Sequence, residues 1–128
     1  MKFHLLRWLM PMLFGLALLG QPLHAQDTDD IIEKLRLTQT QREQVKKLRE
    51  AFRKETEPIR VEINRLLEEE KGLKKAAKVN TEQLKTVLKQ RADKEVELSL
   101  ALTTFVQNLE GVFTPEQLKQ WRALKEGK

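Results

Sequence analysis

The chain has 128 residues, which is enough for one domain of ordinary size. It carries 24 Lys and Arg residues against 19 Asp and Glu residues, so its formal net charge is +5, with both signs mixed along the sequence. It contains no cysteine, which excludes disulfide bonds and attachment to a membrane as a cysteine-linked lipoprotein.

The first 25 residues have the pattern of a secretory signal peptide. Lys2 and Arg7 give a positive start, residues 8–19 form a short apolar run, and Leu23-His24-Ala25 ends in a small residue suited to cleavage. We therefore expect a signal peptide at 1–25 and a mature domain at 26–128. An uncleaved anchor is the alternative, although the apolar run is shorter than the ~20 residues of a spanning helix.

Removal of the signal peptide would leave a chemically plain domain. All three Met residues and both His residues lie within 1–25, so the mature region has neither. Its 22 basic residues (24 less Lys2 and Arg7) and 19 acidic residues give a net charge of +3. Ser99 then has no His partner, and zinc, copper or nickel has no imidazole or sulfur ligand. We expect no enzyme activity, no cofactor and no such metal site, and only a weak carboxylate site for a hard cation is left open.

The mature region predicts an all-α fold of three to four helices. A polar, frayed start is expected at 26–30, and a short helix then begins at Asp29 or Asp30. A long second helix follows from Thr38. Its apolar residues recur at helical spacing and form one stripe, which only Thr56 and Glu70 interrupt. The stripe comprises Val45, Leu48, Phe52, Ile59, Ile63, Leu66, Leu73 and Ala77.

Pro58 lies in the middle of this second helix. Proline removes one helical hydrogen bond and clashes with the carbonyl four residues earlier, so the helix is expected to bend or break near Glu57. The stripe keeps its phase across Pro58, which favours a bend. Gly72 and the lysine-rich segment 74–78 mark the expected end of the helix.

A third helix is expected from Asn80 or Thr81 to about Glu110. Arg91 and Glu95 fall on its apolar seam, either as a simple ion pair or as a feature that sets the register of a dimer. The helix is also apolar on a second face, which predicts a cover on that side, and a second subunit is the expected cover. The second face comprises Val96, Leu100 and Val106. Together the helices form a bent hairpin.

Two similar segments mark helix starts. Leu37-Thr38-Gln39-Thr40-Gln41 and Phe113-Thr114-Pro115-Glu116-Gln117 both place Gln three residues after Thr. The Thr hydroxyl accepts a backbone N–H of the first turn while the Gln side chain returns a bond to the Thr N–H, which is a capping box. Pro115 suits the first helical position. A short fourth helix, with Trp121 on its apolar face, is therefore expected after Thr114.

Basic residues alternate with the apolar stripe of the second helix. They are not gathered in the way a nucleic-acid site requires, so no nucleic-acid partner is expected. The plain interpretation is a solvated face, and the alternative is a surface that attracts acidic, partly unfolded chains and holds their apolar segments. The basic residues are Lys46, Lys47, Arg49, Arg53, Arg60 and Arg65.

With these features the chain resembles the Spy/CpxP family of periplasmic chaperones and stress modulators, which carry two Leu-Thr-x-x-Gln motifs. The first motif fits at Leu37, Thr38 and Gln41, and the second fits at Thr114 and Gln117 with Phe113 in place of Leu. The resemblance extends over the mature chain and includes Pro58. It implies a periplasmic location and an antiparallel, cradle-shaped homodimer that binds unfolded clients without ATP.

The resemblance also implies a client surface. Positions that match it are Leu35, Leu37, Val45 and Arg49, and Arg53 belongs to the same basic helix. Arg49 stands where relatives carry Met, and the mature chain has no Met at all, so the metal-sensing branch of the family is not supported. We expect an ATP-independent periplasmic chaperone. The alternative is a modulator of an envelope-stress or metal-resistance sensor that binds one folded partner and not unfolded chains.

Overall fold

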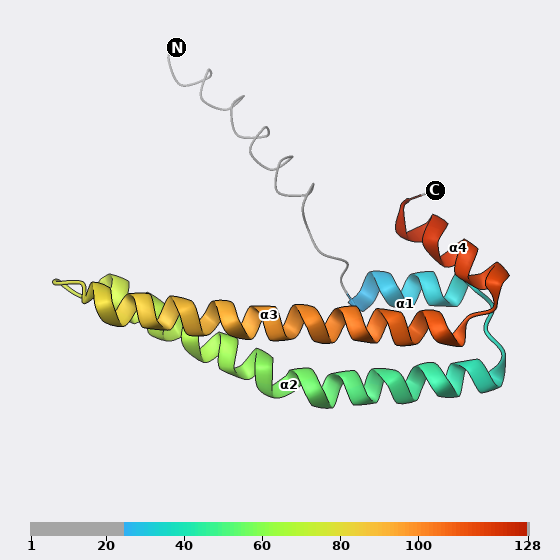
Figure 1. Ribbon diagram of the computed structural model, residues 1–128, viewed down its shortest axis with the longest axis horizontal. Helices are drawn as coiled ribbons and strands as arrows, with labels where there is room; N and C mark the ends of the chain where they lie inside the picture. Colours follow the sequence, from blue (N-terminus) through green and yellow to red (C-terminus); the bar gives the residue numbers. More distant parts are fainter. Residues whose placement is uncertain (1–24, 128) are drawn as a thin grey trace, which may run out of the picture.

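The computed structural model describes residues 25–127, and within that range the chain forms four helices and no strand. They are α1 (Ala25–Lys34), α2 (Gln39–Lys75), α3 (Thr81–Val112) and α4 (Pro115–Lys125). The all-α prediction is confirmed. Helices α2 and α3 form a long hairpin, and α1 and α4 lie near its open end (Figure 1). The predicted signal peptide lies outside the described residues except for Ala25.

Helix α1 begins earlier than its apolar pattern predicted. The helix begins at Ala25 and not at Asp29 or Asp30, so the expectation of a frayed segment at 26–30 was wrong. Thr28 is only 9% exposed. Tertiary packing therefore extends the helix into a polar stretch that carries no apolar periodicity of its own.

Pro58 bends α2 without ending it. The helix is continuous from Gln39 to Lys75, and Figure 1 shows it changing direction near its middle. Thr56, the first interruption of the apolar stripe, is 1% exposed, and its hydroxyl donates a 2.8 Å hydrogen bond to the carbonyl of Phe52. The Phe52 ring stacks on the Phe105 ring of α3 at 4.6 Å between centroids. The Thr56 hydroxyl thus has its hydrogen-bond partner within its own helix. The Phe52–Phe105 ring contact packs α2 against α3 beside it.

Glu70, the second interruption, pairs across the hairpin. Its side chain is 10% exposed, and its two oxygens lie 2.7 Å from Nζ of Lys74 and 3.5 Å from Nε of Arg91 on α3. Arg91 also pairs with Glu95 at 3.8 Å, as its spacing predicted. The hydrogen bond from Lys74 lowers the pKa of Glu70 below 4.5, and the Arg91 charge acts in the same direction against the effect of burial. Glu70 and Arg91, the polar residues within the apolar stripes of the two helices, therefore join α2 to α3 within one chain.

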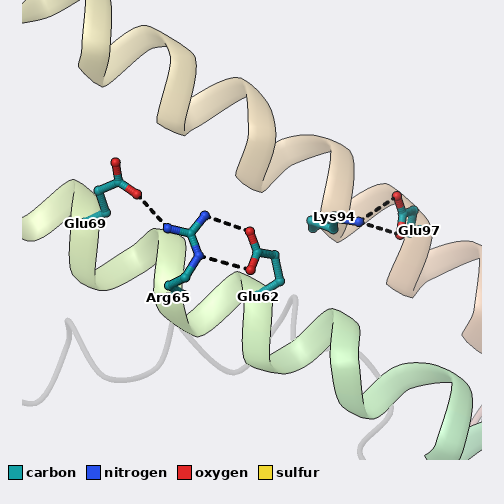
Figure 2. Close-up of polar contacts among 5 residues, drawn as sticks. All are labelled: Glu62, Arg65, Glu69, Lys94 and Glu97. Carbon is teal, nitrogen blue, oxygen red and sulfur yellow. Dashed lines mark hydrogen bonds and ion pairs between the residues drawn. The ribbon is translucent and has the colours of Figure 1, made fainter.

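An exposed ladder of charges lies beside this pair. Arg65 donates to Glu62 and to Glu69 along α2, and Lys94 on α3 donates to Glu97 (Figure 2). The hydrogen bond from Arg65 lowers the pKa of Glu62, and the charge of Lys94 adds to this effect. Surface pairs of this kind contribute little stability each, so the ladder mainly keeps both helix surfaces soluble.

The apolar core lies at the end of the hairpin where α1 and α4 pack. Trp121 of α4 is fully buried, lies against Phe113, and donates from Nε1 to a carboxylate oxygen of Glu110 at 3.1 Å. Within the described residues, the core lies between Ile31 and Leu124. The buried members are Ile32, Leu35, Leu37, Val45, Phe105, Leu109, Phe113 and Trp121.

The predicted second face of α3 is partly exposed. Val96 and Leu100 are 58% and 63% exposed, whereas Val106 packs against the core. Two of the three residues therefore present apolar surface to solvent within the single chain described, and the dimer that was expected to cover them stays a prediction.

Candidate functional site

Both predicted capping boxes are present. The Thr38 hydroxyl accepts from the backbone N–H of Gln41 at 3.2 Å, and the Thr38 N–H donates to Oε1 of Gln41 at 2.9 Å. The same two bonds, with the same lengths, join Thr114 and Gln117. The Thr–Gln spacing thus defines the starts of α2 and α4, as predicted.

The two motifs meet in space, which the sequence did not predict. Nε2 of Gln41 donates to Oε1 of Gln117 at 2.7 Å, and Nε2 of Gln117 lies 3.3 Å from Oε1 of Gln41. Each amide also reaches a backbone carbonyl of the other connection, Val112 for Gln41 and Leu35 for Gln117. The two helix connections are thereby tied to one another at the open end of the hairpin.

A groove runs between α1 and the first turns of α2, next to this junction. Its volume is about 600 Å³. Apolar side chains line part of it, namely Ile32, Leu37 and Val45. Charged side chains form the rest, namely Asp29, Glu33, Arg36, Arg42, Lys46 and Arg49. Four cations against two carboxylates make the groove basic, with apolar surface at its base.

Two arginines of the groove are held by specific contacts. Arg49 forms an ion pair with Asp29 of α1, and Nε of Arg42 donates to the carbonyl of Leu37 at 3.2 Å. Arg36 adopts a left-handed backbone conformation (φ 52°) between α1 and α2. Non-glycine residues pay about 1 kcal/mol for this conformation. The connection therefore places an arginine where glycine would be less strained.

The basic residues of α2 divide between two faces. At 100° per residue, one basic row follows the groove side of the helix. Lys47 and Arg65 point to the other side, where Lys47 lines a second groove against α3 and Arg65 joins the charge ladder. Arg60 also lies 5.8 Å from the centre of the Phe52 ring. We call the row the basic stripe, and it comprises Arg42, Lys46, Arg49, Arg53 and Arg60.

The structure separates the predicted client-binding residues into two groups. Leu35, Leu37 and Val45 are buried in the core, with 3%, 5% and 3% of their surface exposed. Arg49 and Arg53 are accessible and belong to the basic stripe. The apolar members are therefore packing residues in this conformation, and their contact with clients stays a prediction.

Sequence reasoning missed several residues of the groove and its surroundings. Asp29, Glu33 and Arg36 come from α1 and from the connection, so their proximity to α2 depends on how α1 packs. The pairing of Gln41 with Gln117 spans 76 residues. The recurrence of the same Thr–Gln spacing at both helix starts is the one signal in the sequence that hints at it.

Other kinds of site receive no support from the described part of the chain. Within residues 25–127 no three His, Cys, Asp or Glu side chains are grouped so that they could hold a metal ion. None of the described helices is both long and apolar enough to span a membrane.

The fold and its junction define a class of small all-α proteins, built on a bent hairpin whose two capped helix starts are joined through paired glutamines. A family model described as "LTXXQ motif family protein" matches residues 23–125, about four-fifths of the chain. The chain belongs to this family of Spy/CpxP-like periplasmic proteins. Neither the curated proteins nor the solved structures gave a match.

Proposed function

We propose that this protein is an ATP-independent chaperone of the periplasm that binds unfolded or aggregation-prone chains. The observation that carries the proposal is the groove, in which four cations surround an apolar base, continued along α2 by the basic stripe. Membership of the LTXXQ family is consistent with it.

The groove and stripe suit a two-stage capture. Accessible arginines and lysines attract acidic segments over a distance of about one Debye length, which is ~8 Å at physiological ionic strength. Close contact then favours apolar segments of the client, since their burial removes apolar surface from water. Arg53 and Lys46 are exposed and take part in the first stage.

Contact with Leu35, Leu37 and Val45 would require α1 to shift. Ile32 and Leu35 hold α1 in place through packing in the core. Its polar contacts are exposed or long: the Asp29–Arg49 ion pair and the 3.4 Å hydrogen bond from Gln117 to the carbonyl of Leu35. Exposed ion pairs contribute about 0–1 kcal/mol. We propose that a client chain displaces α1 locally and thereby gains access to these three residues.

The proposal includes a homodimer. Val96 and Leu100 present apolar surface on the side of α3 away from α2, and a second copy would remove it from water. Sedimentation equilibrium tests this: a Val96→Glu/Leu100→Glu variant should be monomeric and still helical. A monomeric wild-type protein at all concentrations would contradict the dimer.

The chaperone activity is tested by diluting a denatured, aggregation-prone protein into buffer with residues 26–128 and without ATP, while light scattering is followed. Suppression should weaken as salt is added. The variant Lys46→Gln/Arg53→Gln should suppress scattering less. The control Lys47→Gln/Lys54→Gln removes two exposed charges at the same spacing, about 100° further around α2 and outside the basic stripe, and should match wild type.

Unaltered scattering with a fully helical sample would reject the chaperone. The protein would then be better explained as a modulator that binds one folded partner, such as an envelope sensor. Pull-down from an envelope extract should in that case recover a single protein through the same groove, and Lys46→Gln/Arg53→Gln should abolish the recovery.

A further inference from the structure

The closed end of the hairpin concentrates positive charge. Residues 71–92, at the end of α2 and the start of α3, contain seven basic residues and one acidic residue, a net charge of +6. Residues 26–128 as a whole have a net charge of +3, so the remainder of that region has a net charge of −3. The turn lies at the opposite end of the molecule from α1 and α4 (Figure 1). The fold thus turns a weakly basic chain into a molecule with one strongly basic end.

Four of these charges are not used for internal contacts. Lys71 pairs with Glu68, and Lys74 and Arg91 pair with Glu70. The remaining four lysines are exposed and have neither an ion pair nor a hydrogen bond from their side chains to any residue of the 25–127 range. They are Lys75, Lys78, Lys85 and Lys89, and we call them the tip lysines.

The shape of the end complements its charge. Every residue of the connection 76–80 is exposed, and Val79 presents an apolar side chain that is 39% exposed. At 1.5 Å per residue, Lys89 lies only about 12 Å along α3 from its first residue. The tip lysines therefore precede and follow the exposed Val79 along the chain, at the protruding end of the hairpin (Figure 1).

We infer that the tip lysines and Val79 form a docking surface for a membrane that carries anionic phospholipid headgroups. A protruding end can bring several lysines onto a flat, anionic surface at once. Lysine on a flexible stem adapts to headgroups that have no fixed geometry. Each lysine near an anionic membrane contributes roughly a factor of five in affinity, and a shallow apolar side chain adds to this.

This contact is peripheral and involves no spanning segment. When the tip is bound, the groove lies at the other end of the hairpin, away from the membrane, since α3 alone is about 48 Å long. The groove would therefore stay accessible while the tip is bound. The inference does not depend on the proposed chaperone activity.

Co-sedimentation of residues 26–128 with lipid vesicles tests the inference. Binding is expected to vesicles that contain phosphatidylglycerol, to weaken with salt, and to be absent with phosphatidylcholine alone. The variant Lys75→Gln/Lys78→Gln/Lys85→Gln/Lys89→Gln should lose about 600-fold in partition coefficient, a factor of about five for each lysine. The control Lys34→Gln/Lys47→Gln/Lys54→Gln/Lys119→Gln removes four exposed lysines elsewhere and should stay close to wild type. Circular dichroism confirms that both variants are helical.

Three results would overturn the inference. They are failure of the wild-type protein to bind the anionic vesicles, equal losses in both quadruple variants, and binding of soluble polyglutamate that depends on the tip lysines while vesicle binding does not. The light-scattering assay separates the two proposals, because the tip variant should still suppress aggregation if the groove holds the client.

Discussion

The side-chain amides of Gln41 and Gln117 form a reciprocal pair, with nitrogen-to-oxygen distances of 2.7 and 3.3 Å. Each glutamine also closes its own capping box. The third residue of α2 is thus bonded to the third residue of α4, 76 positions later. A local device for starting a helix serves at the same time as a tertiary contact.

Substitution of either glutamine should therefore cost more than the loss of a cap. Gln41→Ala or Gln117→Ala removes the return bond, takes one hydrogen bond from the partner amide and leaves a backbone carbonyl without its amide donor. Each should therefore lower the free energy of unfolding by about 1–3 kcal/mol. The double variant should lose less than the sum, with a coupling of about 0.5–1.5 kcal/mol. Urea denaturation measures all four proteins. Strict additivity would show that the amide pair contributes nothing beyond the two caps.

Trp121 should be the most sensitive position in α4. Its side chain is fully buried between α4 and the hairpin, and Trp121→Ala should lower the free energy of unfolding by about 3–5 kcal/mol. Trp121→Phe keeps an aromatic ring but leaves the Glu110 carboxylate without its indole donor, so an intermediate loss is expected. Chemical denaturation, followed by far-ultraviolet circular dichroism, measures the stability of both variants. If Trp121→Phe lost as much free energy of unfolding as Trp121→Ala, the hydrogen bond to Glu110, and not the burial of the ring, would account for the effect.

Stability should depend on pH through Glu70. Lys74 and Arg91 lower its pKa in the folded state from the ordinary value of 4.5. The ionised carboxylate therefore stabilises the fold fully at pH values above 4.5. That contribution is lost as the pH falls through the lowered pKa. Glu70→Gln should therefore unfold at a lower temperature than wild type at neutral pH, and the difference should shrink at acidic pH. Glu55→Gln, an exposed site on the same helix, is the control and should show no such convergence.

Loosening α1 should raise the proposed chaperone activity. Asp29→Asn removes the ion pair with Arg49, which frees that guanidinium and weakens the attachment of α1 at a cost of about 0–1 kcal/mol. Suppression of light scattering should become stronger per molecule. Asp30→Asn removes an exposed charge from the neighbouring position and should behave as wild type. Weaker suppression by Asp29→Asn would argue against a role for α1 displacement.

Local patterns in the sequence predicted most of the fold. The starts of α2 and α4 follow from Thr38 and Thr114, and the bend follows from Pro58, because caps and proline act within one helical turn. The hairpin follows from the matching apolar stripes. The start of α1 at Ala25 could not be predicted, since it rests on packing and not on periodicity.

The candidate site was less predictable than the fold. Arg49 and Arg53 were found because their charges alternate with an apolar stripe on one helix. The burial of Leu35, Leu37 and Val45 depends on α1 and on the core at the end of the hairpin, and no spacing within α2 reveals it. The partners of Gln41 and Glu70 come from distant segments for the same reason.

The burial of Trp121 gives the mature protein an optical probe of its own. The chain contains two tryptophans, and Trp8 lies in the predicted signal peptide, so residues 26–128 retain Trp121 as their single indole. Its fluorescence emission should shift to longer wavelength when α4 leaves the hairpin, because the ring then enters water. Release of one terminal helix can therefore be followed in solution, without a label, while circular dichroism reports whether the long hairpin remains folded.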